Sequence, residues 1–119
     1  MKWIIAGGRD FEDYDTLIAI AGKVVRREDT IISGGAKGAD ALGEQFAERN
    51  GLELDVYPAE WDKYGKGAGY RRNHQMSLVG DGLIAFWDGK SRGTKNMIEN
   101  AHKARLTTVV VYYGKEISK

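Results

Sequence analysis

The stretch of the sequence with the clearest chemical potential is SGGAKGAD, which runs from Ser33 to Asp40. It places three glycines, a lysine and a carboxylate between the apolar pair Ile31–Ile32 and a segment with helical periodicity. Glycines let a backbone approach a ligand closely, and a following helix adds the positive end of its dipole. The stretch therefore favours a phosphate cradle, although a strand-to-helix turn can need glycine for its geometry alone.

Three further stretches combine glycine with basic residues after a predicted strand: GGRDF, AEWDKYGKGAGYRRN and WDGKSRGT. Turns such as REDT and ARLT, expected at the opposite rim of the sheet, have no glycine. In an open parallel sheet, ligands bind beyond the carboxyl ends of the strands. The four stretches together predict one site for an anionic ligand, formed by Gly7, Gly8, Arg9, Asp10, Ser33, Gly34, Gly35, Ala36, Gly38, Asp40, Arg72, Asn73, Trp87, Asp88, Gly93 and Thr94.

Several of these residues have two interpretations. We expect Arg9 to pair with phosphate, whereas Asp40 can take ribose hydroxyls, hold a metal-bound water or cap its own helix. Asn73 can bond the ligand or brace the loop. Trp87, like Trp61, can stack on a base, but Trp87 also ends a buried strand and suits the core equally well. The stretches match neither the P-loop nor the G-x-G-x-x-G pattern.

Composition excludes several kinds of site. The chain has no cysteine, and its two histidines, His74 and His102, are far apart, so no disulfide or metal site is predicted. The formal net charge of +1 gives little bulk attraction to nucleic acid or membrane. The N-terminal apolar run is too short for a signal peptide or a membrane span. We therefore expect a cytoplasmic protein without a membrane partner.

The elements that must position the site alternate along the 119 residues, a length that suits one domain. Apolar runs predict strands at residues 3–6, 30–33, 52–57, 83–87 and 107–113. Apolar spacing of three and four predicts helices between them, begun by Asp13 or Asp15, by Ala39 and by Thr94, the last reaching Arg105. A short helix from about Tyr70 should turn Met76 and Val79 inward, after a glycine-rich loop.

This alternation predicts an α/β fold: a single Rossmann-like domain with an open, mostly parallel sheet of about five strands and helices on both faces. We expect the first strand at the centre of the sheet. The strand at residues 52–57 alternates apolar and polar side chains, which predicts a half-exposed edge strand. Gly51, after Asn50, suits the end of the preceding helix.

The stretches IAGGRDF, IISGGAKGAD, AEWDKYGKGAGYRRN and LIAFWDGKSRGT together resemble the YspA/YpsA-related branch of the SLOG superfamily. The resemblance covers residues 3–112. It implies one SLOG-type domain over residues 1–119 that binds a nucleotide or nucleotide-derived ligand, as a sensor or a processing domain. Such a ligand could bring Mg²⁺ with it; no other cofactor is implied.

Two relatives within the superfamily imply alternatives. The LOG family cleaves nucleoside monophosphates at the N-glycosidic bond, although here Lys90–Ser91–Arg92 replace the glycine run of its motif and Glu99 stands two residues late. The DNA-processing protein A family implies binding of single-stranded DNA, which needs stacking aromatics in a basic groove. Whether the chain is an enzyme stays open. A homodimer is expected only because it is the commonest oligomer.

Overall fold

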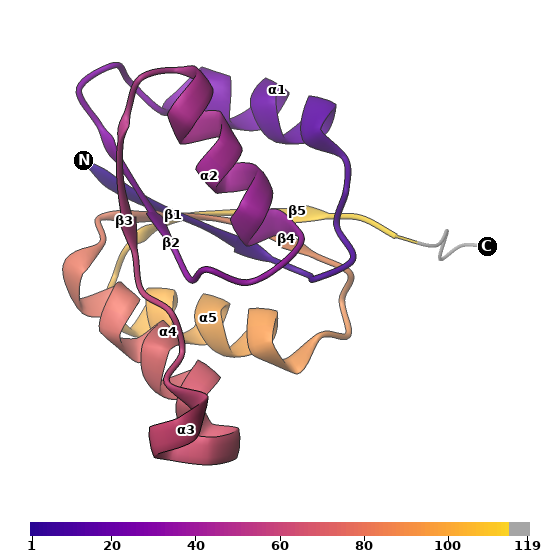
Figure 1. Ribbon diagram of the computed structural model, residues 1–119. Coiled ribbons are helices and arrows are strands. Elements are labelled where there is room, and N and C mark those ends of the chain that lie inside the picture. The colour runs from indigo at the N-terminus through magenta and orange to yellow at the C-terminus, as the bar shows by residue number, and fades with distance from the viewer. Residues whose placement is uncertain (115–119) are drawn as a thin grey trace.

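The sheet has five strands, all parallel, in the order β3-β2-β1-β4-β5 (Figure 1). They are β1 (Lys2–Gly7), β2 (Thr30–Ser33), β3 (Glu53–Val56), β4 (Gly82–Trp87) and β5 (Thr107–Tyr112). The computed structural model describes residues 1–114. The α/β Rossmann-like fold, the central first strand and the edge position of residues 52–57 are confirmed.

Helices α1 (Tyr14–Val24) and α2 (Ala39–Arg49) cover one face, and α4 (Ala68–Val79) and α5 (Arg92–Lys103) cover the other (Figure 1). Strand β1 shows why its sequence is continuously apolar. Trp3 and Ile5 belong to the core under the first pair of helices, while Ile4 and Ala6 belong to the core under the second. A central parallel strand is buried on both faces, so the middle residues of β1, from Trp3 to Ala6, are all apolar, while Lys2 at its start is exposed.

Short polar signals set the helix ends. Asp13 is the N-cap of α1, and its carboxylate accepts hydrogen bonds from the backbone N–H of Thr16 at 3.0 Å and from its hydroxyl at 2.6 Å. Ser91 caps α5 by accepting from the N–H of Thr94 at 3.4 Å. Gly51 follows the C-cap Asn50, at the helix end where it was predicted, and has a φ of 67°, the left-handed conformation common there.

The segment after β3 differs from the prediction of a long loop. It contains a short helix, α3 (Trp61–Tyr64), a 3₁₀ turn, η1 (Gly65–Gly67), and then α4, which begins at Ala68. Met76 is buried as predicted, but Val79 is 39% exposed and Ser77 takes an inward position instead. The error follows from reading glycines as loop residues, whereas in this segment they stand in η1 and the first turn of α4.

Two smaller predictions are also wrong. The alternating pattern does not bury one face of β3. All four of its residues are exposed, Leu54 at 37% and Val56 at 44%, because β3 is an edge strand of the sheet. The last helix was predicted to reach Arg105, but α5 ends at Lys103 and Arg105 has a φ of 63°. The glycine asymmetry between the rims is incomplete too, since Gly51 and Gly80 lie at the opposite rim, ahead of β3 and β4. No helix among residues 1–114 is long and apolar enough to cross a membrane.

Candidate functional site

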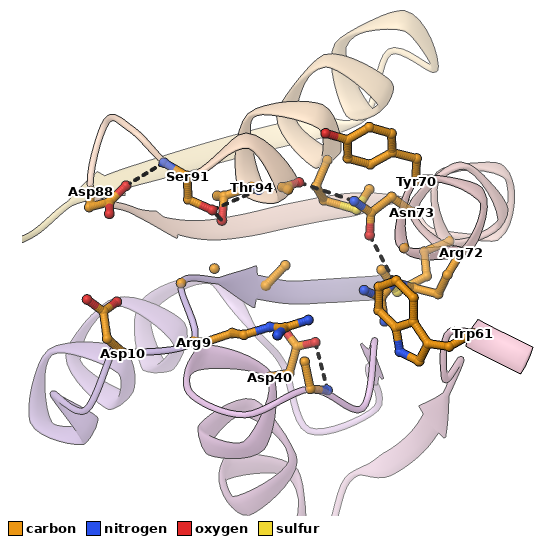
Figure 2. Close-up of a pocket in the computed structure, with 18 of the residues that line it drawn as sticks. Arg9, Asp10, Asp40, Trp61, Tyr70, Arg72, Asn73, Asp88, Ser91 and Thr94 are labelled. Atoms are coloured by element: carbon orange, nitrogen blue, oxygen red, sulfur yellow. Dashed lines mark hydrogen bonds between the residues drawn. The ribbon is translucent and has the colours of Figure 1, made fainter. Parts of the chain in front are cut away.

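A cavity of about 470 Å³ lies at the carboxyl ends of the central strands, between the loops after β1, β2 and β4 and the inner face of α4 (Figure 2). The structure brings all four predicted stretches to this cavity. Eleven of the sixteen predicted site residues line it: Gly7, Gly8, Arg9, Asp10, Ala36, Asp40, Arg72, Asn73, Asp88, Gly93 and Thr94.

Gly34 and Gly35 line a second cavity of about 460 Å³ instead. Ser33 lies beneath the loop, fully buried, where its hydroxyl donates to Glu44 at 2.6 Å and accepts from the N–H of Gly35 at 3.0 Å. The N–H of Ala36 donates to the Asp40 carboxylate at 3.2 Å. Two N–H groups expected to face a phosphate are therefore used inside the protein.

Gly38 and Trp87 line neither cavity and have packing roles. A side chain on Gly38 would place its Cβ 2.2 Å from the carbonyl oxygen of Gly8, so this glycine lets the first two loops touch. The same Gly8 oxygen accepts from the N–H of Ala39 at 3.2 Å. Trp87 packs against the core on the α5 side, and its indole N–H donates to the carbonyl of Ser91 at 3.0 Å. These contacts assign Trp87 to the core.

The cavity also has lining residues outside the predicted set: Ala6, Trp61, Lys66, Gly69, Tyr70, Met76, Ser91 and Met97. Four of the positions that α4 contributes, Gly69, Arg72, Asn73 and Met76, share the spacing i, i+3, i+4 and i+7. That spacing marks one face of a helix. A helical interpretation beginning at Ala68 would have added Gly69 and Met76 to the predicted Arg72 and Asn73.

Asp40, on the first turn of α2, is the buried acid of the cavity, with 5% of its surface exposed. Burial raises its pKa to about 6, since leaving water penalises the carboxylate. The hydrogen bond from Ala36, and then the positive charges of Arg72 and Arg9, act in the opposite direction, while Glu44 raises the pKa further. Asp40 therefore changes protonation close to neutral pH, unlike an ordinary surface aspartate.

Arg72 reaches Asp40 from α4 and is half-buried, which lowers its pKa. Its Nε donates to Asn73 Oδ1 at 2.9 Å, and its Nη1 donates to the carbonyl oxygen of Gly34. Nη2 has no hydrogen-bond partner among residues 1–114. The guanidinium is thus held in place on one side and free to donate on the other.

Arg9 stands in the loop after β1, exposed, and Figure 2 shows its guanidinium beside Asp40. Within the described part of the chain, its side chain makes no hydrogen bond or salt bridge. Its charge nevertheless lowers the pKa of Asp40. An arginine in a cavity that makes no hydrogen bond to the protein is available to a ligand phosphate.

The remaining polar residues are engaged with the protein. Asn73 braces the floor, its amide donating to the carbonyl of Gly93 at 3.2 Å and to Asn96 at 3.1 Å. Asp88 accepts from the N–H groups of Lys90 and Ser91, both at 2.8 Å, and these bonds lower its pKa. Asp10 accepts from the Tyr113 hydroxyl at 2.6 Å. Across residues 1–114, no group of three or more histidines and acidic residues could hold a metal ion.

Comparison with known proteins agrees with the motifs. The sequence model of a family described as "YspA, cpYpsA-related SLOG family" matches residues 1–64, which include the loops after β1 and β2. The Gene 61 protein of Mycobacterium phage D29 is 30% identical to this chain, in a match that covers 89% of this chain and 92% of the phage protein. The chain belongs to the YspA/cpYpsA-related SLOG family.

Proposed function

We propose that this protein binds a nucleotide or a nucleotide-derived phosphate ligand in the cavity at the carboxyl ends of its strands. Membership of a SLOG family indicates a nucleotide-related ligand at a general level. The volume of about 470 Å³ falls in the range of small-molecule sites. The observation that carries the proposal is the arrangement of two arginines around one buried carboxylate.

Each part of a nucleotide has a matching group in the cavity. Arg9 and the free Nη2 of Arg72 suit a phosphate, because guanidinium groups bind phosphate oxygens through charge-assisted hydrogen bonds. Asp40 suits ribose hydroxyls, which donate to a carboxylate. Trp61 and Tyr70, both exposed at the cavity wall, offer aromatic faces to a base (Figure 2). The cavity thus offers cationic and aromatic groups near Asp40, with Trp61 beside Arg72 (Figure 2).

A thermal-shift screen tests the proposal, using nucleoside mono- and diphosphates, cyclic nucleotides, NAD and ADP-ribose. A ligand at about 100 times its dissociation constant should stabilise the fold by roughly 2.7 kcal/mol. Arg9→Ala should reduce this stabilisation to roughly 0.4–1.4 kcal/mol, as a 10- to 100-fold loss of affinity requires, whereas Arg27→Ala, on an exposed arginine away from the cavity, should keep it in full. Absence of a shift with every nucleotide would contradict the proposal.

One observation favours a second candidate, N-glycosidic hydrolysis of a nucleoside monophosphate. A carboxyl group with a pKa of about 6 can supply a proton near neutral pH, which is what a general acid needs. In that reaction Asp40 would protonate the departing base, and water would add to the ribose carbon. Glu99, the acid nearest in sequence to the LOG motif, does not line the cavity.

Chromatography of the free base distinguishes hydrolysis from binding alone. The wild type should release base from one of the ribonucleoside monophosphates, and Asp40→Asn should abolish the release while it keeps a folded spectrum. Binding of the nucleotide without release of base would contradict hydrolysis and favour a sensor or binding domain.

A further inference from the structure

The second cavity, of about 460 Å³, adjoins the first and is lined by the Gly34–Lys37 loop and by the Pro58–Ala59 turn. Arg9, Ala36, Trp61 and Arg72 line both cavities. The two spaces therefore meet at the pair of arginines. A ligand that occupied one of them could extend past these arginines into the other.

The two cavities differ in charge. The first contains three carboxylates, those of Asp10, Asp40 and Asp88, which offset the positive charges of Arg9, Arg72 and Lys66. The second has Lys37 in addition to both arginines, and none of its lining residues is acidic. A group with two negative charges is therefore attracted to the second cavity, whereas neutral hydroxyls and a base suit the first.

Side chains supply most of the positive charge in the second cavity. The N–H groups of Gly35 and Ala36 already donate to Ser33 and Asp40. Lys37 is exposed and makes no side-chain hydrogen bond or salt bridge within the described residues. Its ammonium group is consequently free for a phosphate, and its loss should not disturb the fold.

We propose that the ligand carries at least two phosphates and lies across both cavities. On the proposed nucleotide function, the nucleoside occupies the first cavity beside Asp40. The first phosphate binds Arg9 and Arg72 where the cavities meet, and the second phosphate enters the second cavity against Lys37. The ligand class is thus a nucleoside diphosphate or a larger nucleotide that contains a diphosphate, and a monophosphate fills only part of the site.

Calorimetric titration of the full chain with the common ribonucleoside 5′-monophosphates and 5′-diphosphates, with and without Mg²⁺, tests this assignment. For at least one base, the diphosphate should bind about tenfold more tightly than the monophosphate, as one added charge-assisted contact predicts. Lys37→Ala should remove that advantage and leave monophosphate affinity unchanged. Lys23→Ala, which removes an exposed lysine from α1, should retain it.

The outcomes separate this inference from the proposed function. Equal affinity for mono- and diphosphates of every base, or a diphosphate preference that survives Lys37→Ala, overturns the two-cavity assignment while nucleotide binding stands. Absence of binding by any nucleotide overturns both. Circular dichroism of Lys37→Ala establishes that a lost preference is not a folding defect.

Discussion

Arg72, on α4, donates a hydrogen bond from Nη1 to the carbonyl oxygen of Gly34, the residue directly after β2. The same nitrogen lies 3.5 Å from the carbonyl oxygen of Tyr57, directly after β3. One side chain therefore joins a helix to the carboxyl ends of two strands, while it also lines both cavities. Arg72 has a structural role as well as the ligand role predicted from the sequence.

Arg72→Ala should lower the free energy of unfolding by about 1–3 kcal/mol, because hydrogen bonds from a charged donor are lost and buried carbonyls remain. Arg72→Lys keeps the charge but cannot reproduce the guanidinium fork, so it should recover only part of the loss. Urea denaturation measures both. Arg71→Ala is the matched control: its guanidinium, 4.1 Å from the Tyr64 ring centroid, is exposed, and its loss should cost about 0.5–1 kcal/mol. Equal losses of unfolding free energy for Arg72→Ala and Arg71→Ala would contradict the structural role of Arg72 in joining α4 to the ends of β2 and β3.

Arg9→Ala should behave differently, because the Arg9 side chain has no protein partner within residues 1–114. We expect unchanged stability and an affinity for the nucleotide found by screening that is about 10- to 100-fold lower, the loss of one charge-assisted contact. Titration calorimetry measures the affinity, and urea denaturation measures the stability. Wild-type affinity in Arg9→Ala would remove the first loop from the site.

Much of the fold was predictable because apolar runs, helical spacing and capping residues in the sequence agree with the strands and helices that the fold packs together. The strand at residues 30–33 and the helix start at Asp13 are examples. The interpretation of residues 59–69 as a loop was wrong because three glycines and several charged residues outweighed a weak helical pattern there. Because the helix was predicted to begin only at about Tyr70, Gly69, the first residue on the cavity face of α4, was missed, whereas Arg72 and Asn73 were predicted.

The sequence could not show which predicted site residues face the cavity and which pack inside the protein, because this depends on contacts between residues far apart in sequence. SGGAKGAD predicts a glycine-rich loop, but only the fold shows that Gly38 touches Gly8 and that the Asp40 carboxylate takes the Ala36 N–H. Trp87 follows the same rule, because its core position depends on packing against the buried residues on the α5 side of the sheet.

Substitutions of glycine should separate packing from ligand contact in this loop. Gly38→Ala combines a φ of 76° with a Cβ 2.2 Å from a backbone oxygen, so it should cost about 2–5 kcal/mol of unfolding free energy. Gly35→Ala has a similar φ of 74°, but its nearest neighbour is a Val56 side-chain atom at 3.2 Å. It should cost only the backbone penalty of about 1–2 kcal/mol.

The control for these glycines is Gly22→Ala on the exposed face of α1, where a Cβ would meet nothing within 4 Å. Alanine is the better helix former, so stability should rise by about 0.5–1 kcal/mol. Thermal or urea unfolding of the three variants measures their stabilities, which should increase from Gly38→Ala through Gly35→Ala to Gly22→Ala. A Gly38→Ala protein as stable as Gly35→Ala would mean that the first two loops do not touch as the structure has them.

The last prediction concerns the protonation of Asp40 and its effect on stability. Its pKa is raised from an ordinary 3.8 to about 6, chiefly by burial, with Arg72, Arg9 and Glu44 as the charged groups around it. A raised pKa means that folding favours the protonated acid. The contribution of Asp40 to stability is therefore fully present below the unfolded pKa and is lost as the pH rises through the folded pKa. The loss should approach about 3 kcal/mol.

Asp40→Asn isolates this effect, because asparagine can still accept the Ala36 N–H but does not titrate. Other carboxyls, including Asp13 and Asp88 with lowered pKa values, titrate alike in both proteins and cancel in the comparison. The unfolding free energy of the variant minus that of the wild type should therefore rise by about 2–3 kcal/mol as the pH is raised from about 4 to about 8. Urea denaturation across that range measures the difference directly. A difference independent of pH would mean that Asp40 titrates as an ordinary aspartate. It would also remove the protonated acid on which the hydrolytic alternative depends.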